Sequence, residues 1–148
     1  MEIICIIGLL TLIVLPVYFY NDLPAQIPKH FNASGSVDSY GDRKIIWLLP
    51  TVGLFLYVGL TFLAKAPFAF NYPVKVTDEN AKKLYTLGAR TIRILKVIVI
   101  LSFVFLNYKT IAIALNRSSE ISKFYLPVFL FVILAFTVTM IFKMIKTR

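Results

Sequence analysis

The only histidine of the chain, His30, lies in a polar segment, LPAQIPKHFNASGSVDSYGD (residues 23–42), between two long apolar runs. Three acidic residues lie within or beside this segment: Asp22, Asp38 and Asp42. A histidine among carboxylates could hold a metal ion or act in acid–base catalysis. The spacing does not favour either chemistry, and a metal-binding or hydrolytic protein built on His30 and these acidic residues remains an alternative hypothesis.

A nucleophilic site is the second chemistry to consider, because Ser34 and Ser36 could in principle pair with His30. The chain has no His-Glu-x-x-His motif, no second histidine and only one cysteine, Cys5. We therefore expect no catalytic residue, no metal ligand and no cofactor. The favoured interpretation is a structural histidine, whose ring hydrogen-bonds a loop carbonyl or Asp38.

The composition indicates a membrane protein. Of the 148 residues, 59% are hydrophobic and 16% are charged, whereas soluble domains average about 45–50% and about 25%. The formal net charge is +9, but nearly half of the basic residues crowd one segment between apolar runs and none forms a dense basic block. This pattern is typical of the positive-inside bias of membrane proteins and argues against nucleic-acid binding.

Apolar runs long enough to cross a bilayer as helices divide the chain. We expect a single membrane domain (1–148), all-α, with four transmembrane helices. The spans are predicted at about residues 3–20, 45–64, 92–115 and 124–142. A structured, outward-facing motif loop (21–44) joins the first two spans.

The basic residues predict the orientation. The connection between the second and third spans, with its flank, carries seven basic residues, and Lys143, Lys146 and Arg148 follow the last span. That side holds ten, whereas the other side holds six. The positive-inside rule then places both termini in the cytoplasm.

An amphipathic helix over 78–96 is predicted as the cytoplasmic extension of the third span, with Thr77 as its N-cap and Asp78 and Glu79 in its first turn. At about 100° per residue, one face is basic and the other is apolar. The basic residues are Lys82, Lys83, Arg90, Arg93 and Lys96. The apolar-side residues are Leu84, Leu87, Thr91, Ile94 and Leu95. The basic face could meet anionic lipid headgroups or a cytoplasmic partner.

The motif loop is rich in residues that constrain the backbone. Pro24 and Pro28 bias their neighbours toward extended geometry. Gly35 can adopt a positive φ and Asn32 can bond nearby backbone, so NASGS predicts a tight turn. Gly41 is expected to make a second turn before the next span. The result is a compact cap over the helix ends, with a short hairpin as one possible form.

The motif loop resembles a bacterial domain-of-unknown-function family, number 1648. The shared pattern is Leu-Pro, then Ile-Pro-x-His-Phe-Asn, then Gly, then Asp and an aromatic residue, between two spans. The matching site residues are Pro24, Pro28, His30, Phe31, Asn32, Gly35, Asp38 and Tyr40. Leu23, Ile27, Gly41 and Pro50 also fit the pattern. The resemblance continues through NYPVKVTDENAKKLYTLGARTIRILK and covers about two-thirds of the chain.

This family also forms the N-terminal membrane domain of SdpI-like immunity proteins, which protect bacteria from a secreted peptide toxin. The resemblance implies a multi-pass protein of the bacterial cytoplasmic membrane, with possible partners in a peptide toxin, another membrane protein or a cytoplasmic repressor. Full-length immunity members carry further spans in a second region, which these 148 residues do not include. We expect a non-enzymatic immunity or sensing protein, and a structural subunit of a larger complex is a further alternative.

Overall fold

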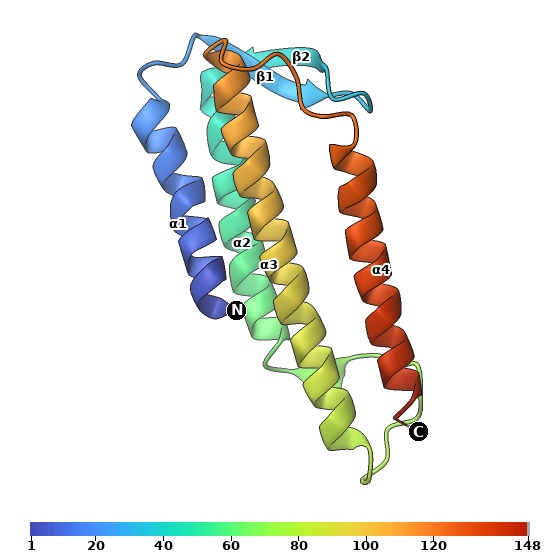
Figure 1. Ribbon diagram of the computed structural model, residues 1–148. Helices are drawn as coiled ribbons and strands as arrows, with labels where there is room; N and C mark the ends of the chain where they lie inside the picture. The colour runs from blue at the N-terminus through green and yellow to red at the C-terminus, as the bar shows by residue number, and fades with distance from the viewer. Residues whose placement is uncertain (148) are drawn as a thin grey trace.

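The computed structural model describes residues 1–147 and consists of four long helices capped at one end by a small sheet (Figure 1). In chain order the elements are α1 (Glu2–Phe19), β1 (Gln26–Phe31), β2 (Val37–Asp42), the 3₁₀ helix η1 (Arg43–Trp47), α2 (Leu48–Leu63), the 3₁₀ helix η2 (Pro67–Ala69), α3 (Ala81–Ala114) and α4 (Tyr125–Ile145). With η1 continuing into α2, four helical segments are long and apolar enough to cross a membrane, as predicted. Arg148, which the orientation argument counts, lies outside the described residues.

The all-α prediction is incomplete, because β1 and β2 pair as an antiparallel hairpin. The second turn expected at Gly41 is wrong. Gly41 lies inside β2 opposite Ile27, where the Lys29 side chain crosses it. A Cβ at this position would come within 3.2 Å of Lys29 Cδ, so the glycine serves close packing across the hairpin.

An apolar cluster fastens the hairpin to the helices. Ile27 from β1 is fully buried, and it packs with Leu23, Ile46 and Ile111. Each of these residues comes from a different segment: the connection after α1, β1, η1 and α3. Burial of an aliphatic side chain contributes about 1.5–3 kcal/mol, so the hairpin is held as part of the helical domain.

Helices α1, α2 and α3 pack against one another, and α4 packs along α3 (Figure 1). The approach of α1 to α3 is close at Gly8, where a Cβ would come within 2.8 Å of Ile100 Cγ2. Among the four span windows, that of α4 is the least buried, at 11%. Helix α4 is therefore the peripheral member of the bundle.

Helix α3 is the longest element, with 34 residues. At 1.5 Å per residue it is about 51 Å long, which exceeds the roughly 30 Å hydrocarbon core of a bilayer. Asn116 ends the helix with a φ of +55°, and Arg117 N donates back to Ala112 O at 2.8 Å. This left-handed residue after the last turn is a common helix stop.

The start of α3 differs from the prediction by three residues. The helix begins at Ala81, with Asn80 as the N-cap. Asn80 Oδ1 accepts from Thr77 N at 2.9 Å, which closes a separate turn over Asp78 and Glu79. These two acidic residues therefore precede the helix. Thr77 Oγ1 accepts from Asn80 N at 3.4 Å, so Thr77 caps this separate turn rather than α3, and the turn takes the place of an earlier helix start.

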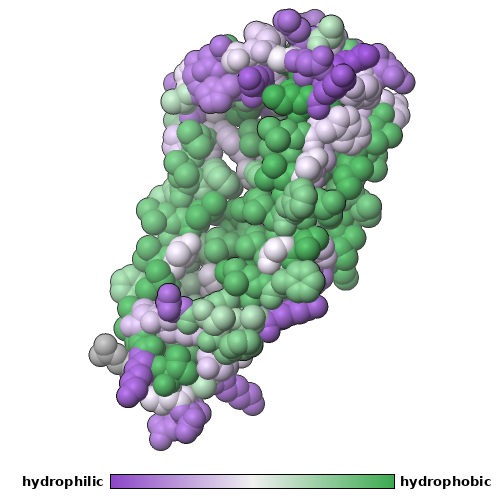
Figure 2. Space-filling view, turned by 180° about the vertical axis from the view of Figure 1, so that it is seen from behind, coloured by the Kyte–Doolittle hydropathy of each residue, from purple (hydrophilic) through white to green (hydrophobic). Residues whose placement is uncertain are grey.

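The surface has a polar region at each end and an apolar belt between them (Figure 2). Large side chains of the belt are exposed, among them Ile3 at 73%, Phe55 at 73% and Phe131 at 70%. Both termini lie toward the end opposite the hairpin (Figure 1). An apolar belt of this extent is characteristic of a chain whose solvent is lipid.

Candidate functional site

The hairpin turn is built around the side chain of Asn32. Its Oδ1 accepts from Ser34 N at 3.0 Å, from Ser36 N at 3.1 Å and from Ser34 Oγ at 2.6 Å. Gly35 has a φ of +85°, which a residue with a Cβ adopts only under strain. The positive φ expected at Gly35 and the backbone bonding expected of Asn32 are both present.

A second segment, between α3 and α4, docks onto this turn. Ile121 N donates to Gly35 O at 2.9 Å, and Ser36 Oγ lies 3.5 Å from Glu120 Oε2. A Cβ on Gly35 would come within 2.0 Å of Ile121 O. Gly35 is thus required twice, for the sign of φ and for the approach of the other loop.

His30 and Asp38 form a pair on the surface of the hairpin. His30 Nδ1 lies 2.7 Å from Asp38 Oδ1, and their side chains are 68% and 41% exposed. Of the two partners considered for a structural His30, the structure therefore shows Asp38. The hydroxyl groups of Ser34 and Ser36 bond Asn32 and Glu120, so the geometry gives no support to a nucleophile paired with His30.

The metal alternative needs at least a third ligand near this pair. Among residues 1–147, no group of three or more His, Cys, Asp or Glu side chains could hold a metal ion. A single exposed His–Asp pair is too few ligands for a tight site. The geometry therefore supports the metal hypothesis less than the structural role of His30.

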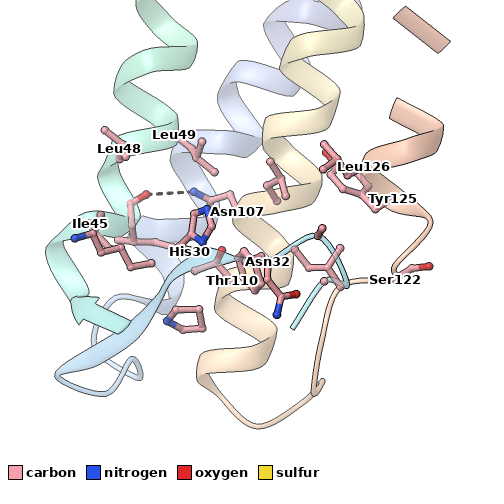
Figure 3. Close-up of a pocket in the computed structure, with 18 residues that line it drawn as sticks. His30, Asn32, Ile45, Leu48, Leu49, Asn107, Thr110, Ser122, Tyr125 and Leu126 are labelled. Carbon is pink, nitrogen blue, oxygen red and sulfur yellow. Dashed lines mark hydrogen bonds between the residues drawn. The ribbon is translucent and has the colours of Figure 1, made fainter. Parts of the chain in front are cut away.

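A cavity of about 310 Å³ lies beneath the hairpin, where β1, η1, α2, α3 and the start of α4 meet (Figure 3). Most of its wall is apolar and comes from Ile45, Ile46, Leu48, Leu49, Leu106, Ile121 and Leu126. The hairpin contributes successive residues 28–33 and Gly35. This size and composition are within the usual range for small-ligand sites.

The motif residues divide into two sets. Five line the cavity: Pro28, His30, Phe31, Asn32 and Gly35. The remaining three are not part of its wall: Pro24, Asp38 and Tyr40. Pro24 precedes β1, Asp38 holds His30, and Tyr40 pairs with Pro28 across the sheet. The motif residues thus form one wall of the cavity and the part of the hairpin that supports this wall.

Asn107 is a cavity residue that sequence reasoning missed. It is 0% exposed, and its Nδ2 donates to Ile46 O at 3.2 Å (Figure 3). Its Oδ1 has no hydrogen-bond partner within residues 1–147; we call this atom the open acceptor. The signal in the sequence is the amide itself, since a polar side chain within a span is costly and marks function.

Thr110 and Tyr125 complete the polar part of the wall. Thr110 lies one turn beyond Asn107 on α3 and is 8% exposed. Tyr125 begins α4, hydrogen-bonds Ser102 of α3 and stacks on Phe105 with the ring centroids 4.8 Å apart. These contacts attach the first turn of α4 to α3 and close one side of the cavity.

Lys96 was expected on an exposed basic face, and this expectation is wrong. The side chain is 1% exposed. Its Nζ donates to both carboxylate oxygens of Glu2 at 2.9 Å and to Thr61 Oγ1 at 2.8 Å, and lies 4.5 Å from the centroid of the Tyr57 ring. The reason is that the first turn of α1 lies beside the middle of α3, so Lys96 meets a carboxylate before it reaches solvent.

The other four basic residues of the predicted amphipathic segment (78–96) are exposed: Lys82, Lys83, Arg90 and Arg93. We call them the basic surface. Leu84, on the other side, is fully buried. Glu79, Lys82, Lys83 and Arg90 line a shallow hollow at this end. Four of the five residues predicted for the basic face are therefore exposed, and one predicted for the opposite side is buried.

The connection between α2 and α3 folds back on this helix through Tyr72. Its hydroxyl donates to Pro67 O at 2.7 Å, and its ring lies 5.9 Å from that of Tyr85. Burial, with a smaller contribution from Tyr85, raises the pKa of Tyr72 above its usual value.

The family expected from the motif matches this segment of the chain. The family model described as "Domain of unknown function (DUF1648)" matches residues 6–54. The match covers about a third of the 148 residues and shows that this segment is similar to the DUF1648 family. The DUF1648 segment runs from α1 through the hairpin into α2 and holds every motif residue. The opposite cavity wall, with Asn107, Tyr125 and Leu126, lies outside it. No curated protein and no solved structure matches the chain.

Proposed function

We propose that this chain is a non-enzymatic protein of the bacterial cytoplasmic membrane that senses, or gives immunity to, a secreted peptide or another envelope component at its hairpin end. The observation that carries the proposal is the cavity of about 310 Å³, in which five motif residues meet residues of α2, α3 and α4, among them the buried Asn107 and Thr110. An apolar cavity closed by a hairpin suits binding better than catalysis, since no nucleophile and base are paired among its polar groups: His30 bonds Asp38, Asn32 bonds the turn, and Asn107 bonds Ile46 O.

Expression in a strain that is sensitive to membrane-active peptides tests this function. Survival should rise for at least one peptide of a panel. It should fall back with His30→Ala, which removes a cavity residue, and with Gly35→Val, which displaces the segment docked on the turn. Gly59→Ala is the control, because nothing lies within 4 Å of the added Cβ. Unchanged killing across the panel would overturn the proposal.

The proposal requires the hairpin end to face outward and both termini to lie in the cytoplasm, as the basic residues predict. Ser36→Cys should react with an impermeant thiol reagent on whole cells, whereas Lys83→Cys should react only after lysis. The native Cys5 is 0% exposed, so the unmodified chain is the blank. The reverse labelling pattern would place the cavity on the cytoplasmic side. It would then contradict the proposal that the cavity binds secreted peptides.

The basic surface then lies at the cytoplasmic end, and we propose that it rests on anionic headgroups, since its four cations are exposed and next to the span. Crosslinking in native membranes should recover anionic lipid with the native chain and less with Lys82→Gln/Lys83→Gln. Capture of one defined protein through the same residues would instead indicate a cytoplasmic partner, such as a repressor.

A further inference from the structure

The cavity runs along one edge of β1. It touches the four successive strand residues 28–31, and its wall includes no residue of β2 among the described residues. Successive side chains of a strand point to opposite faces. The pairing with β2 is irregular here, with register shifts between Pro28 and His30 and between His30 and Phe31, so the alternation is interrupted. Because the wall holds these four residues and none of β2 among the described residues, the cavity follows the side of β1 that faces away from β2.

This edge of β1 is unpaired. The sheet has two strands in the described part of the chain, and within that part β1 makes backbone hydrogen bonds to β2 and to no other element. Pro28 fits such a position, because proline is found on edge strands, where no ladder donor is lost. An exposed strand edge is a template for another extended segment.

The open acceptor of Asn107 requires that the ligand also carry a hydrogen-bond donor. A buried carbonyl oxygen without a partner costs about 1–3 kcal/mol, and this one belongs to a side chain that lines the cavity. An occupant that brings an N–H or O–H to it would recover that free energy. A plain acyl chain has no such group.

The charges on the wall exclude a cationic donor. Lys29 and His30 line the cavity, and no Asp or Glu from the described chain does so. An ammonium group, such as that of an ethanolamine headgroup, would find no counter-ion there. The matching donor is neutral, and a peptide amide supplies it together with the backbone groups that an unpaired strand edge requires.

We propose that the cavity binds an extended, apolar peptide segment that adds to the free edge of β1, places an aliphatic side chain among Leu49, Leu106 and Leu126, and donates an amide N–H to Asn107 Oδ1. This inference rests on the proposed function and names its ligand class. It also explains why the motif and the cavity occur together, since the motif shapes the strand whose edge is used.

Photocrosslinking of the purified full chain in phosphatidylglycerol nanodiscs tests the proposal. The probe is acetyl-Leu-Val-Leu-Val-amide with a photoreactive leucine in place of its second leucine. Labels should concentrate on Phe31, Leu106 and Leu126, and unlabelled peptide should compete for them. The matched probe carries N-methyl groups on alternate amides, which keeps the side chains but blocks pairing along the strand, and it should label at least tenfold less.

Two pairs of variants complete the test. Asn107→Leu should weaken labelling about tenfold by removing the acceptor, whereas Thr139→Leu, a polar-to-apolar change on exposed α4 surface, should not. Leu126→Trp should block the cavity, whereas Leu134→Trp, at another exposed α4 position outside it, should leave labelling unchanged.

Equal labelling by both probes, or labels spread over belt residues such as Leu134, would overturn the inference and identify the cavity as a lipid site. The two proposals can fail separately. Protection of cells that survives Asn107→Leu and Leu126→Trp would contradict this inference alone. Specific peptide labelling without protection of cells would contradict the proposed function alone.

Discussion

Lys96 and Asn107 are two buried polar side chains on the same helix with opposite surroundings. They are 11 residues apart on α3, about three turns, and so lie on nearly the same side of it. The Lys96 ammonium has Glu2, Thr61 and the Tyr57 ring as partners. Asn107 has a partner for its Nδ2 and, within residues 1–147, none for its Oδ1. The Lys96 ammonium, with all its partners inside the protein, links α1, α2 and α3. The Asn107 amide still has an acceptor that a bound ligand could use.

The comparison extends to the two ends of the molecule. At the Lys96 end, side chains from α1, α2 and α3 neutralise one buried charge. At the hairpin end, backbone groups and the Asn32 side chain determine the shape of a turn, and the side chains below leave a cavity. The variants below test whether the first end provides stability and the second end provides binding.

Gly35→Val should have the largest effect on stability. It forces a β-branched residue into a φ of +85° and a Cβ to within 2.0 Å of Ile121 O. Strain and the lost Ile121–Gly35 hydrogen bond together predict a loss of about 3–4 kcal/mol. Unfolding by SDS in mixed micelles measures it, with Gly59→Ala as control. A loss below about 1 kcal/mol would mean that the docked segment moves away at little cost.

Glu2→Gln should be next, at about 2–3 kcal/mol, because it leaves the Lys96 ammonium buried without its carboxylate. The value is below that of fully buried pairs, since Glu2 is 47% exposed. The same SDS titration applies, with Glu79→Gln as control. Adding Lys96→Met to Glu2→Gln should restore most of the loss. Equal losses of stability in the single and double variants would show that the loss does not come from an unpaired Lys96 ammonium.

Asn107→Leu should change the free energy of unfolding by less than about 1 kcal/mol, in either direction. The variant loses the bond to Ile46 O but removes the unpartnered oxygen, and these effects nearly cancel. A loss comparable to that of Glu2→Gln would break the comparison, because Asn107 would then be a structural residue like Lys96. A stable variant that no longer binds peptide would show that Asn107 acts in binding, unlike Lys96.

His30→Ala should have the smallest effect on folding, below about 0.5 kcal/mol, because its pair with Asp38 is largely exposed. Asp38→Asn should match it, and a double-mutant cycle measures the coupling between the two. A coupling above about 1 kcal/mol would show that the pair braces the hairpin more than its exposure indicates.

The local features that were predicted correctly depend on residues close together in the chain. Long apolar runs predicted the spans, and the Asn32–Gly35 stretch predicted a turn, because helix length and turn chemistry are local properties. The strand at Gly41 was missed, since pairing with Ile27 depends on a partner strand. The prediction that Lys96 is exposed was wrong because its carboxylate partner, Glu2, is 94 positions away in the chain. The cavity was missed for the same reason, because its walls come from five elements.

The unbroken length of α3 has a mechanical consequence. One end of the helix carries Asn107 and the cavity, and the other carries the basic surface, with no proline between them. If such a helix tilts as a rigid body about the Lys96 region, where it is bonded to α1 and α2, its two ends move in opposite directions. Over about 51 Å, a tilt of about 5° displaces one end by about 4 Å relative to the other. A segment that wedges into the cavity and tilts α3 would therefore move the basic surface across the opposite face of the membrane, without any change inside the helix itself.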